Sequence, residues 1–247
     1  YPIYEFIYIV DASTDNSNEK VINYIDKSYN NIIIDLNLEN SGNVFSQWKK
    51  GISKAKGDYI WIAEADDLSD RYFLENIMKG FEYDNVVISY SQSKQINEAG
   101  SIIANEYLYY TNDVDIHKWS TDYVNNGVDE IKQCMSIKNT IPNISAVVVK
   151  KVNNINVICS EIDNYKVAGD WLFYINLLEI GNIYFCSKSL NYHRRHEDSI
   201  VKTVNNKIHF NEIVAIQNYI SNKYDLSKEI SNKVQLYRTI VKKYLKV

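Results

Sequence analysis

Short apolar runs alternate with segments of helical periodicity along the first third of the chain. Each run is rich in aliphatic and β-branched residues and is followed by a polar one, which predicts a buried strand over residues 6–10 and further strands over residues 32–36 and 59–63. Between the strands, the spacing of apolar side chains predicts helices that begin near Asn16 and near Asn40. Gly57 is expected to end the second helix, and a third helix is expected to begin near Ser69. This alternation predicts a parallel sheet, with the loops at the carboxyl ends of its strands along one edge.

Beyond residue 86 the regular alternation of strand and helix gives way to strands, turns and helices in a mixed order. Strands are predicted over residues 86–90, 145–149 and 183–186, with a turn near residues 97–100. Residues 171–180 are apolar on all sides, as in a buried helix, and residues 208–247 have the period of two amphipathic helices. We therefore expect an α/β domain over residues 1–201, with a mixed, mainly parallel sheet flanked by helices, and a C-terminal helical extension over residues 202–247.

Composition and charge narrow the class of protein. The chain has 247 residues and a formal net charge of −4, which argues against a nucleic-acid-binding protein because such proteins need a basic face. No apolar run has the length of a transmembrane segment, and no signal peptide is visible, so we expect a cytoplasmic protein. The three cysteines lack any Cys-x-x-Cys spacing, which predicts buried free thiols at Cys134, Cys159 and Cys186.

Polar residues follow each of the first three predicted strands. They are Asp11, Asn40, Gly42, Glu64, Asp66 and Asp67. Neighbouring carboxylates at a strand end are hard oxygen ligands, which suit Mg²⁺ or Mn²⁺ shared with the phosphates of a ligand. Under the alternative interpretation, the aspartates only cap the next helix. Ligand sites in α/β sheets form at this edge, which favours the first interpretation.

Two later segments also carry candidate chemistry. Asp170 stands at the start of the all-apolar helix, where it is either a general base or a helix cap. His196 lies with Arg194 and Arg195 in a short polar stretch after a strand, and this stretch either returns to the acidic residues or forms a solvated charged turn. Trp171 is either a core residue or a platform for a second substrate.

As a set, these segments resemble the successive signatures of family 2 glycosyltransferases with the GT-A fold. The acidic signature is Glu-Ala-Asp-Asp, and the Ala-Gly-Asp-Trp segment resembles the family's catalytic-base motif. The segment from Leu190 resembles the closing Tyr-Arg-x-His-x-x-Ser element. In chain order, the matching stretches are residues 1–17, 40–42, 50–60, 64–67, 168–171 and 190–199.

The resemblance implies a metal-dependent, inverting transferase that moves a sugar from a nucleoside diphosphate to an acceptor hydroxyl. It implies Mn²⁺ or Mg²⁺ held by Asp67, Asp66 and His196, and Asp170 as the base that takes the acceptor's proton. It also implies contacts with the nucleotide sugar from Asp11, Ser13, Asp15, Asn40, Gly42, Asp66 and Arg194.

The sequence departs from the family pattern at several points. Ala12 replaces a second acid or an asparagine, Gln47-Trp48 replaces an Arg-Asn pair, and Glu64 replaces an aspartate, which indicates a distinct subgroup. The family's opening strand has no counterpart before Tyr1. We expect the chain to be cut from a longer polypeptide, because a missing central strand would expose hydrogen-bonding edges.

The resemblance also sets the expected partners and the alternatives. We expect a UDP- or TDP-type sugar donor and a saccharide or lipid-linked acceptor, with possible peripheral association at the inner face of a membrane, in the synthesis of a surface glycan. One alternative is a degenerate module that binds a nucleotide sugar or a glycan without turnover. The other is a nucleotidyltransferase, but no Gly-rich basic phosphate loop is visible near the N-terminus.

Overall fold

The computed structural model describes residues 2–24, 31–196 and 204–247. Ile25, expected in the first helix, and residues 197–199 of the last family signature lie outside these ranges. The N-terminal part contains β1 (Phe6–Val10), α1 (Ser17–Tyr24), β2 (Ile32–Leu36) and α2 (Val44–Lys54). Strands β1 and β2 pair in parallel as a two-stranded sheet. The first two predicted strands are therefore confirmed, but β1 is only partly buried, since only Val10 is buried.

Helix α2 packs its apolar stripe into the core. Phe45, Trp48 and Ile52 are buried, so Trp48 has the core position that its spacing predicts. The N-cap is Asn43 rather than Asn40, because the Asn43 side chain accepts a hydrogen bond from the Phe45 N–H at 3.0 Å. The expectation that Gly57 ends this helix was wrong: the helix stops at Lys54, and Ala55 already has an extended backbone.

A seven-stranded sheet forms the centre of the molecule. Its strands are β3 (Tyr59–Trp61), β4 (Leu68–Ser69), β5 (Val86–Ile96), β6 (Ile102–Ala104), β7 (Tyr123–Asn125), β8 (Val147–Lys150) and β9 (Asn182–Arg194). The main order is β3-β8-β5-β9-β4, while β6 pairs with β5 and β7 with β9. The long central pair β5 and β9 is parallel, and the other pairs are antiparallel.

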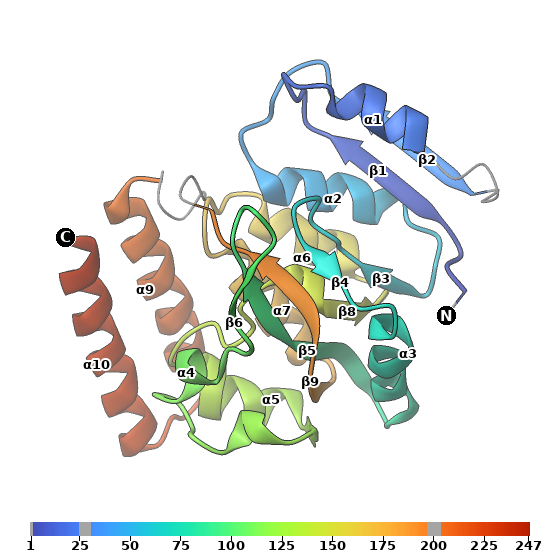
Figure 1. The fold of residues 1–247 in the computed structure, drawn as a ribbon. Helices are drawn as coiled ribbons and strands as arrows, with labels where there is room; N and C mark the ends of the chain where they lie inside the picture. Colours follow the sequence, from blue (N-terminus) through green and yellow to red (C-terminus); the bar gives the residue numbers. More distant parts are fainter. Residues whose placement is uncertain (1, 25–30, 197–203) are drawn as a thin grey trace.

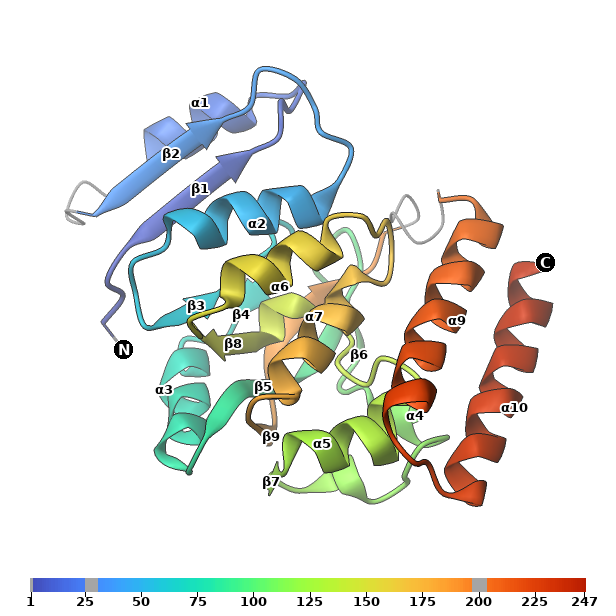
Figure 2. The same cartoon turned by 180° about the vertical axis from the view of Figure 1, so that it is seen from behind.

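Strand β3 differs from expectation. The alternating pattern predicts that it lies parallel in one sheet with β1 and β2, but it pairs antiparallel with β8 in the larger sheet. Local periodicity identifies a strand but not its partner, and β8 comes about ninety residues later in the chain. The mixed α/β class itself is present, with helices against the sheet (Figures 1 and 2).

Two other local expectations were wrong. Ser69 does not begin a helix; it belongs to the short strand β4, which pairs with Asn191 and Tyr192 of β9. The strand expected over residues 183–186 is longer, because β9 runs from Asn182 to Arg194 and includes the start of the polar stretch. The extended β9 supplies a pairing edge for β4 that the local residues do not encode.

Short helices connect the strands, and longer ones cover the sheet. The short ones are α3 (Phe73–Ile77), α4 (Leu108–Thr111), α5 (Gly127–Glu130), the 3₁₀ turns Met78–Glu82, Lys118–Ser120 and Ile144–Ala146, and the π-turn Ile131–Met135. The longer ones are α6 (Ile155–Ile162), α7 (Gly169–Leu178), α9 (Asn206–Lys223) and α10 (Lys228–Leu245). The all-apolar helix and the two C-terminal helices are therefore confirmed.

Helices α9 and α10 stand side by side at one flank, away from β1 and β2 (Figures 1 and 2). Ile213, Ile216 and Ile220 of α9 are buried in the same apolar cluster as the residues of α7. The expected domain boundary at residue 201 lies outside the described residues. Cys134, Cys159 and Cys186 are buried and free, as predicted.

A cavity of about 830 Å³ lies between β1 and β3. Ile7 and Ile9 of β1, Ile60 of β3, and Trp48 and Ile52 of α2 line it. In the part of the chain that the structure describes, β1 pairs only with β2 and β3 only with β8, so each strand has one unpaired edge. Within the same ranges, no helix is both long and apolar enough to cross a membrane.

Candidate active site

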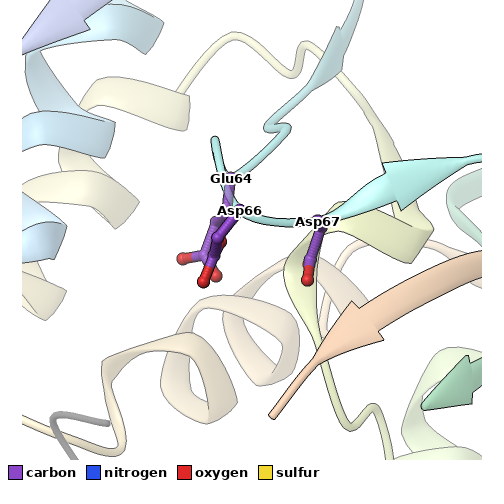
Figure 3. Close-up of side chains that lie close together, drawn as sticks. All are labelled: Glu64, Asp66 and Asp67. Carbon is purple, nitrogen blue, oxygen red and sulfur yellow. The ribbon is translucent and has the colours of Figure 1, made fainter. Parts of the chain in front are cut away.

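Three acidic side chains gather on the loop that follows β3. Carboxylate oxygens of Glu64, Asp66 and Asp67 lie within 4.8 Å of one another. Figure 3 shows the three side chains projecting to the same side of this loop. A hydrogen bond from the Asp67 N–H to the Glu64 carbonyl, 3.2 Å long, closes the turn. The structure therefore brings together Glu64, Asp66 and Asp67, the three neighbouring carboxylates that the sequence places after this strand.

Asp67 is oriented by donors from distant parts of the chain. Its Oδ1 accepts the Arg194 N–H at 2.8 Å, and its Oδ2 accepts the Asn143 amide at 3.3 Å. The same amide donates to Oδ1 of Asn191, a fully buried side chain of β9, at 2.8 Å. Burial raises the pKa of Asp67, although the hydrogen bond from Arg194 opposes this rise. The carboxylate is thus fixed by β9 and by the segment before β8.

Asp66 faces the end of β9. Its Oδ2 lies 2.8 Å from Nε2 of His196, and its carbonyl accepts Nε–H of Arg194 at 2.7 Å. The Arg194 guanidinium also donates to the carbonyls of Asn97 and Glu98, so it ties the hairpin after β5 to the acidic loop. His196 and Arg194 therefore lie at the acidic loop, as expected, but Arg194 contacts backbone carbonyls there.

Glu64 is the most protected of the three carboxylates. Burial, together with the charges of Asp67, Asp66 and Asp170, raises its pKa to about 8. Glu64 lines both the large cavity and a second cavity of about 130 Å³, which also contains Asp170. Glu64 and the candidate base therefore line the same small cavity.

The chemistry of this group fits a hard divalent cation. Three carboxylates on one loop, with an imidazole beside them, are the ligands that Mg²⁺ and Mn²⁺ accept. Grouped like charges raise one another's pKa, as at Glu64, and a bound cation would relieve this repulsion.

Asp170 lies in the first turn of α7. The N-cap of that helix is Ala168, so the capping interpretation does not describe Asp170. Its Oδ1 accepts the Trp171 N–H at 2.7 Å, and its Oδ2 accepts the Asn139 amide at 2.8 Å. Burial raises its pKa to about 7, against these two hydrogen bonds. Trp171 is buried and its indole donates to the Met135 carbonyl, so it is a core residue.

His193 is a site residue that the sequence analysis missed. It lines both cavities, and its Nδ1 lies 2.6 Å from the Tyr107 hydroxyl. Burial, with a smaller contribution from the charge of Arg195, lowers its pKa to about 4, so the imidazole is neutral at pH 7. The sequence offers one signal for it: His193 stands three residues before His196, in the segment that resembles the closing family motif.

A second polar cluster lies at the carboxyl ends of β1 and β2. The Asp11 carboxylate accepts hydrogen bonds from the Asn37 amide and from the backbone and hydroxyl of Ser41, at 2.6 to 2.9 Å. Burial raises the pKa of Asp11, but these donors and the charge of Lys50 outweigh burial and leave it below its usual value. The Asn40 amide donates to the Asp11 carbonyl at 2.9 Å. Asp11 and Asn40, two of the residues predicted to bind the nucleotide sugar, are therefore in contact.

The other predicted donor-binding residues occupy two turns. Gly42 has a φ of 61°, a left-handed conformation that favours glycine, and its N–H donates to the Asn40 side chain at 2.8 Å. Ser13 and Asp15 lie on the exposed turn between β1 and α1, where Asp15 accepts the Ser17 N–H at 2.9 Å. In the described ranges, neither Ser13 nor Asp15 lines either of the two cavities.

Comparison with known proteins identifies a family and related folds. The family model for glycosyl transferase family 2 matches residues 1–133. The glycosyltransferase GlyG of Streptococcus pneumoniae serotype 4 is 31% identical over 121 residues, which are 49% of this chain and 35% of GlyG. The chain therefore spans about a third of the length of this curated relative.

Among solved structures, S. aureus TarS has a similar fold. Its 1–349 fragment in complex with UDP-GlcNAc matches 94% of this chain and 62% of the fragment, with a TM-score of 0.65 and 14% identity. The UDP complex of the same fragment matches with a TM-score of 0.59 and 13% identity, over 94% and 61% of the two chains. At such identities the likeness concerns the fold alone, and it confirms the predicted GT-A type.

Proposed function

The chain belongs to glycosyltransferase family 2, and we propose that it transfers a sugar from a nucleoside diphosphate to the hydroxyl of a saccharide or lipid-linked acceptor, with inversion and with a divalent cation. One observation carries this proposal. Glu64 of the loop after β3 and Asp170 at the start of α7 line one small cavity, together with Asn143 and His193. Asp66 and Asp67 lie beside Glu64 on the same loop.

Asp66 and Asp67, with His196 beside them, would hold the cation. A bound Mn²⁺ or Mg²⁺ supplies positive charge for the diphosphate that leaves the sugar. The Arg194 side chain ties the Asp66 carbonyl to the hairpin after β5 and so holds the acidic loop in place. The contact between His196 and Asp66 supports a shared role for them.

Asp170 is the proposed general base. In a single displacement, the acceptor oxygen forms a bond to the anomeric carbon while the bond from that carbon to the diphosphate oxygen breaks. The acceptor's proton passes to the Asp170 carboxylate. A carboxyl group with a pKa of about 7 suits this task at neutral pH, because about half of the molecules carry the carboxylate and this carboxylate is basic enough to accept the proton.

The polar cluster around Asp11 is the proposed contact for the nucleoside. Asp11 and Asn40 meet at the carboxyl ends of two parallel strands, the edge where α/β sheets bind ligands. Gly42, Ser13 and Asp15 lie on the turns beside this cluster. A donor of UDP or TDP type is supported by the UDP and UDP-GlcNAc in the complexes of TarS. A lipid-linked acceptor would place the enzyme at the inner face of a membrane.

A thermal-shift screen tests the donor class. The chain is heated with UDP, TDP, GDP and CMP sugars, with Mn²⁺ and with EDTA. We expect a shift that requires both Mn²⁺ and one class of nucleotide, followed by transfer to saccharide acceptors in a radiolabel assay. A nucleotide shift of equal size in EDTA would refute the metal-dependent mechanism.

The second candidate function is nucleotide-sugar binding without turnover. The unpaired edges of β1 and β3 on either side of the large cavity favour it, because they leave one wall of the site open. Under this candidate, the screen gives a shift but no sugar is transferred or hydrolysed. Transfer by the chain would exclude it.

A further inference from the structure

Two segments meet at Asp170, and the C-terminal helix α9 binds both. One is the stretch between the π-turn and the 3₁₀ turn that precedes β8, which carries Asn139. The other is the connection from α6 to α7, residues 166–168. Neither segment has regular secondary structure of its own, so its conformation depends on the groups that bind it.

Glu212 of α9 holds the connection that leads into Asp170. Its carboxylate accepts three successive backbone N–H groups, from Lys166 at 2.7 Å and from Val167 and Ala168 at 2.9 Å each. Ala168 is the N-cap of α7 and has no capping side chain of its own. Glu212 therefore satisfies donors at the start of this helix that would otherwise need another partner.

Gln217, one helical turn or so further along α9, holds the other segment. Its side chain is fully buried, and its amide donates to the Ile137 carbonyl at 2.7 Å. Arg238 of α10 donates to the side-chain oxygen Oε1 of Gln217 at 2.7 Å and so fixes the direction of that amide. The Tyr110 hydroxyl donates to the Asn139 carbonyl at 2.8 Å. The segment is thus held by Gln217 at Ile137 and by Tyr110 at Asn139.

The Asn139 side chain closes the arrangement. Its Oδ1 accepts the Ile141 N–H at 3.1 Å, which leaves the amide hydrogens directed at Oδ2 of Asp170, 2.8 Å away. The other oxygen of Asp170 accepts the Trp171 N–H. Both carboxylate oxygens are therefore held, and the plane of the group is set by residues outside its own helix as well as within it.

We propose that Asn139 and Glu212 are positioning residues for Asp170, so that the C-terminal helix pair forms part of the acceptor side of the active site. This inference rests on the proposed role of Asp170 as the general base. Asn139 orients the carboxylate directly. Glu212 orients the turn from which it projects. Neither residue needs to touch a substrate.

The electrostatic surroundings of Asp170 give each residue a distinct signature. The hydrogen bond from Asn139 lowers the pKa of Asp170, whereas the charge of Glu212 raises it. The other titratable groups that sense the charge of Asp170 are Glu64 on the acidic loop, Tyr110 of α4 and Tyr174 of α7. If Asn139 and Glu212 had only a structural role, replacing either one would leave the titration midpoint of Asp170 unchanged, or both replacements would shift it in the same direction.

The test uses the full chain and four variants beside Asp170→Asn. They are Asn139→Ala, Glu212→Gln, Glu212→Ala and the control Glu179→Ala. Glu179 also binds α9, through the Tyr219 hydroxyl and Lys223, but at the far end of α7. The Asp170 carboxyl is titrated by carbon NMR of aspartate-labelled protein, and its signal is assigned from Asp170→Asn. This readout needs no substrate.

We expect Asn139→Ala to raise the midpoint of this titration by about one pH unit and Glu212→Gln to lower it, while Glu179→Ala leaves it unchanged. With UDP-N-acetylglucosamine and Mn²⁺ as the probe, Asn139→Ala and Glu212→Ala should lower kcat by about tenfold with less than a twofold change in KM. Glu212→Gln should recover part of the rate, because its carbonyl oxygen still accepts N–H groups.

Unchanged midpoints in both Asn139→Ala and Glu212→Gln would overturn the inference, as would equal effects in the Glu179→Ala control. The role of Asp170 as the base is tested by a separate outcome. If Asp170→Asn turns over like the wild type, the role of Asp170 is wrong. If Asp170→Asn is inactive while Asn139→Ala and Glu212→Ala turn over like the wild type, only the positioning role is wrong.

Discussion

Nε2 of His196 lies 2.8 Å from Oδ2 of Asp66, so the last described residue of the β9 segment contacts the acidic loop after β3. Groups that bind or orient a metal ligand typically contribute about 10- to 100-fold to metal affinity. We predict that His196→Ala weakens Mn²⁺ binding in the presence of UDP by at least about tenfold, measured by calorimetry. The matched control is His117→Ala, which removes an exposed histidine elsewhere and should bind Mn²⁺ like the wild type. Equal affinities in the two variants would remove His196 from the site.

Stability should fall as pH rises through the neutral range. Burial raises the pKa of Asp170 from 3.8 to about 7, so the folded state holds a proton that the unfolded state has lost. The stability from this group is complete below pH 4 or so and is lost as pH rises through about 7. We predict that the melting temperature in EDTA declines between pH 5 and pH 8, because the carboxyl of the folded protein loses its proton near neutral pH. Asp170→Asn should make this decline shallower, and the part that remains comes from Glu64, whose pKa is raised to about 8. An identical slope in the variant would contradict a raised pKa at Asp170.

Gly169 is the residue that lets α7 approach α2. A Cβ added there would lie 2.7 Å from the ring of Phe45, so the ring or the start of α7 would have to move. We predict that Gly169→Ala destabilises the chain by about 1–3 kcal/mol in chemical denaturation and lowers turnover, because Asp170 is the next residue. The double variant with Phe45→Leu frees space and should recover part of both losses. Full stability and turnover in Gly169→Ala would show that the space between Gly169 and Phe45 can accommodate a methyl group.

The cavity between β1 and β3 leads to another prediction. Its apolar lining and the two unpaired strand edges suit an added strand of the kind that opens family 2 domains. We predict that a chain lengthened upstream of Tyr1 by such a strand melts at a higher temperature than the present one. The control carries the same extension with prolines at alternate positions, which cannot pair on both edges. If the two extensions raise the melting temperature equally, no strand is added at this cavity.

Local features of the fold could be predicted from the sequence, and pairings could not. β1, β2, α2 and the C-terminal helices carry their own periodicity, so each was placed within a few residues. The partner of β3 and the length of β9 depend on contacts between distant segments. Polar residues such as Asn191 and Arg194 break the apolar pattern of a buried strand, although β9 continues through them.

The candidate site divides in the same way. Adjacent carboxylates on one loop, such as Asp66 and Asp67, are visible as a cluster in the sequence, and the structure keeps them together. His193, Asn139 and Glu212 gain their importance only from contacts across the fold, with the Tyr107 hydroxyl, the Asp170 carboxylate and the α7 N-terminus. Nothing in their local sequence distinguishes them from exposed polar residues.

The most direct test of the central claim is calorimetry of UDP binding, with Mn²⁺ and with EDTA, to the wild type, to Asp67→Asn and to Asp70→Asn. Asp67→Asn keeps the shape of the side chain and removes its charge, and Asp70 is a neighbouring aspartate whose carboxylate accepts the Tyr72 N–H. We predict Mn²⁺-dependent binding to the wild type and to Asp70→Asn, and its loss in Asp67→Asn. Mn²⁺-dependent binding of equal affinity in all three proteins would contradict the assignment of the acidic loop as the metal and diphosphate site.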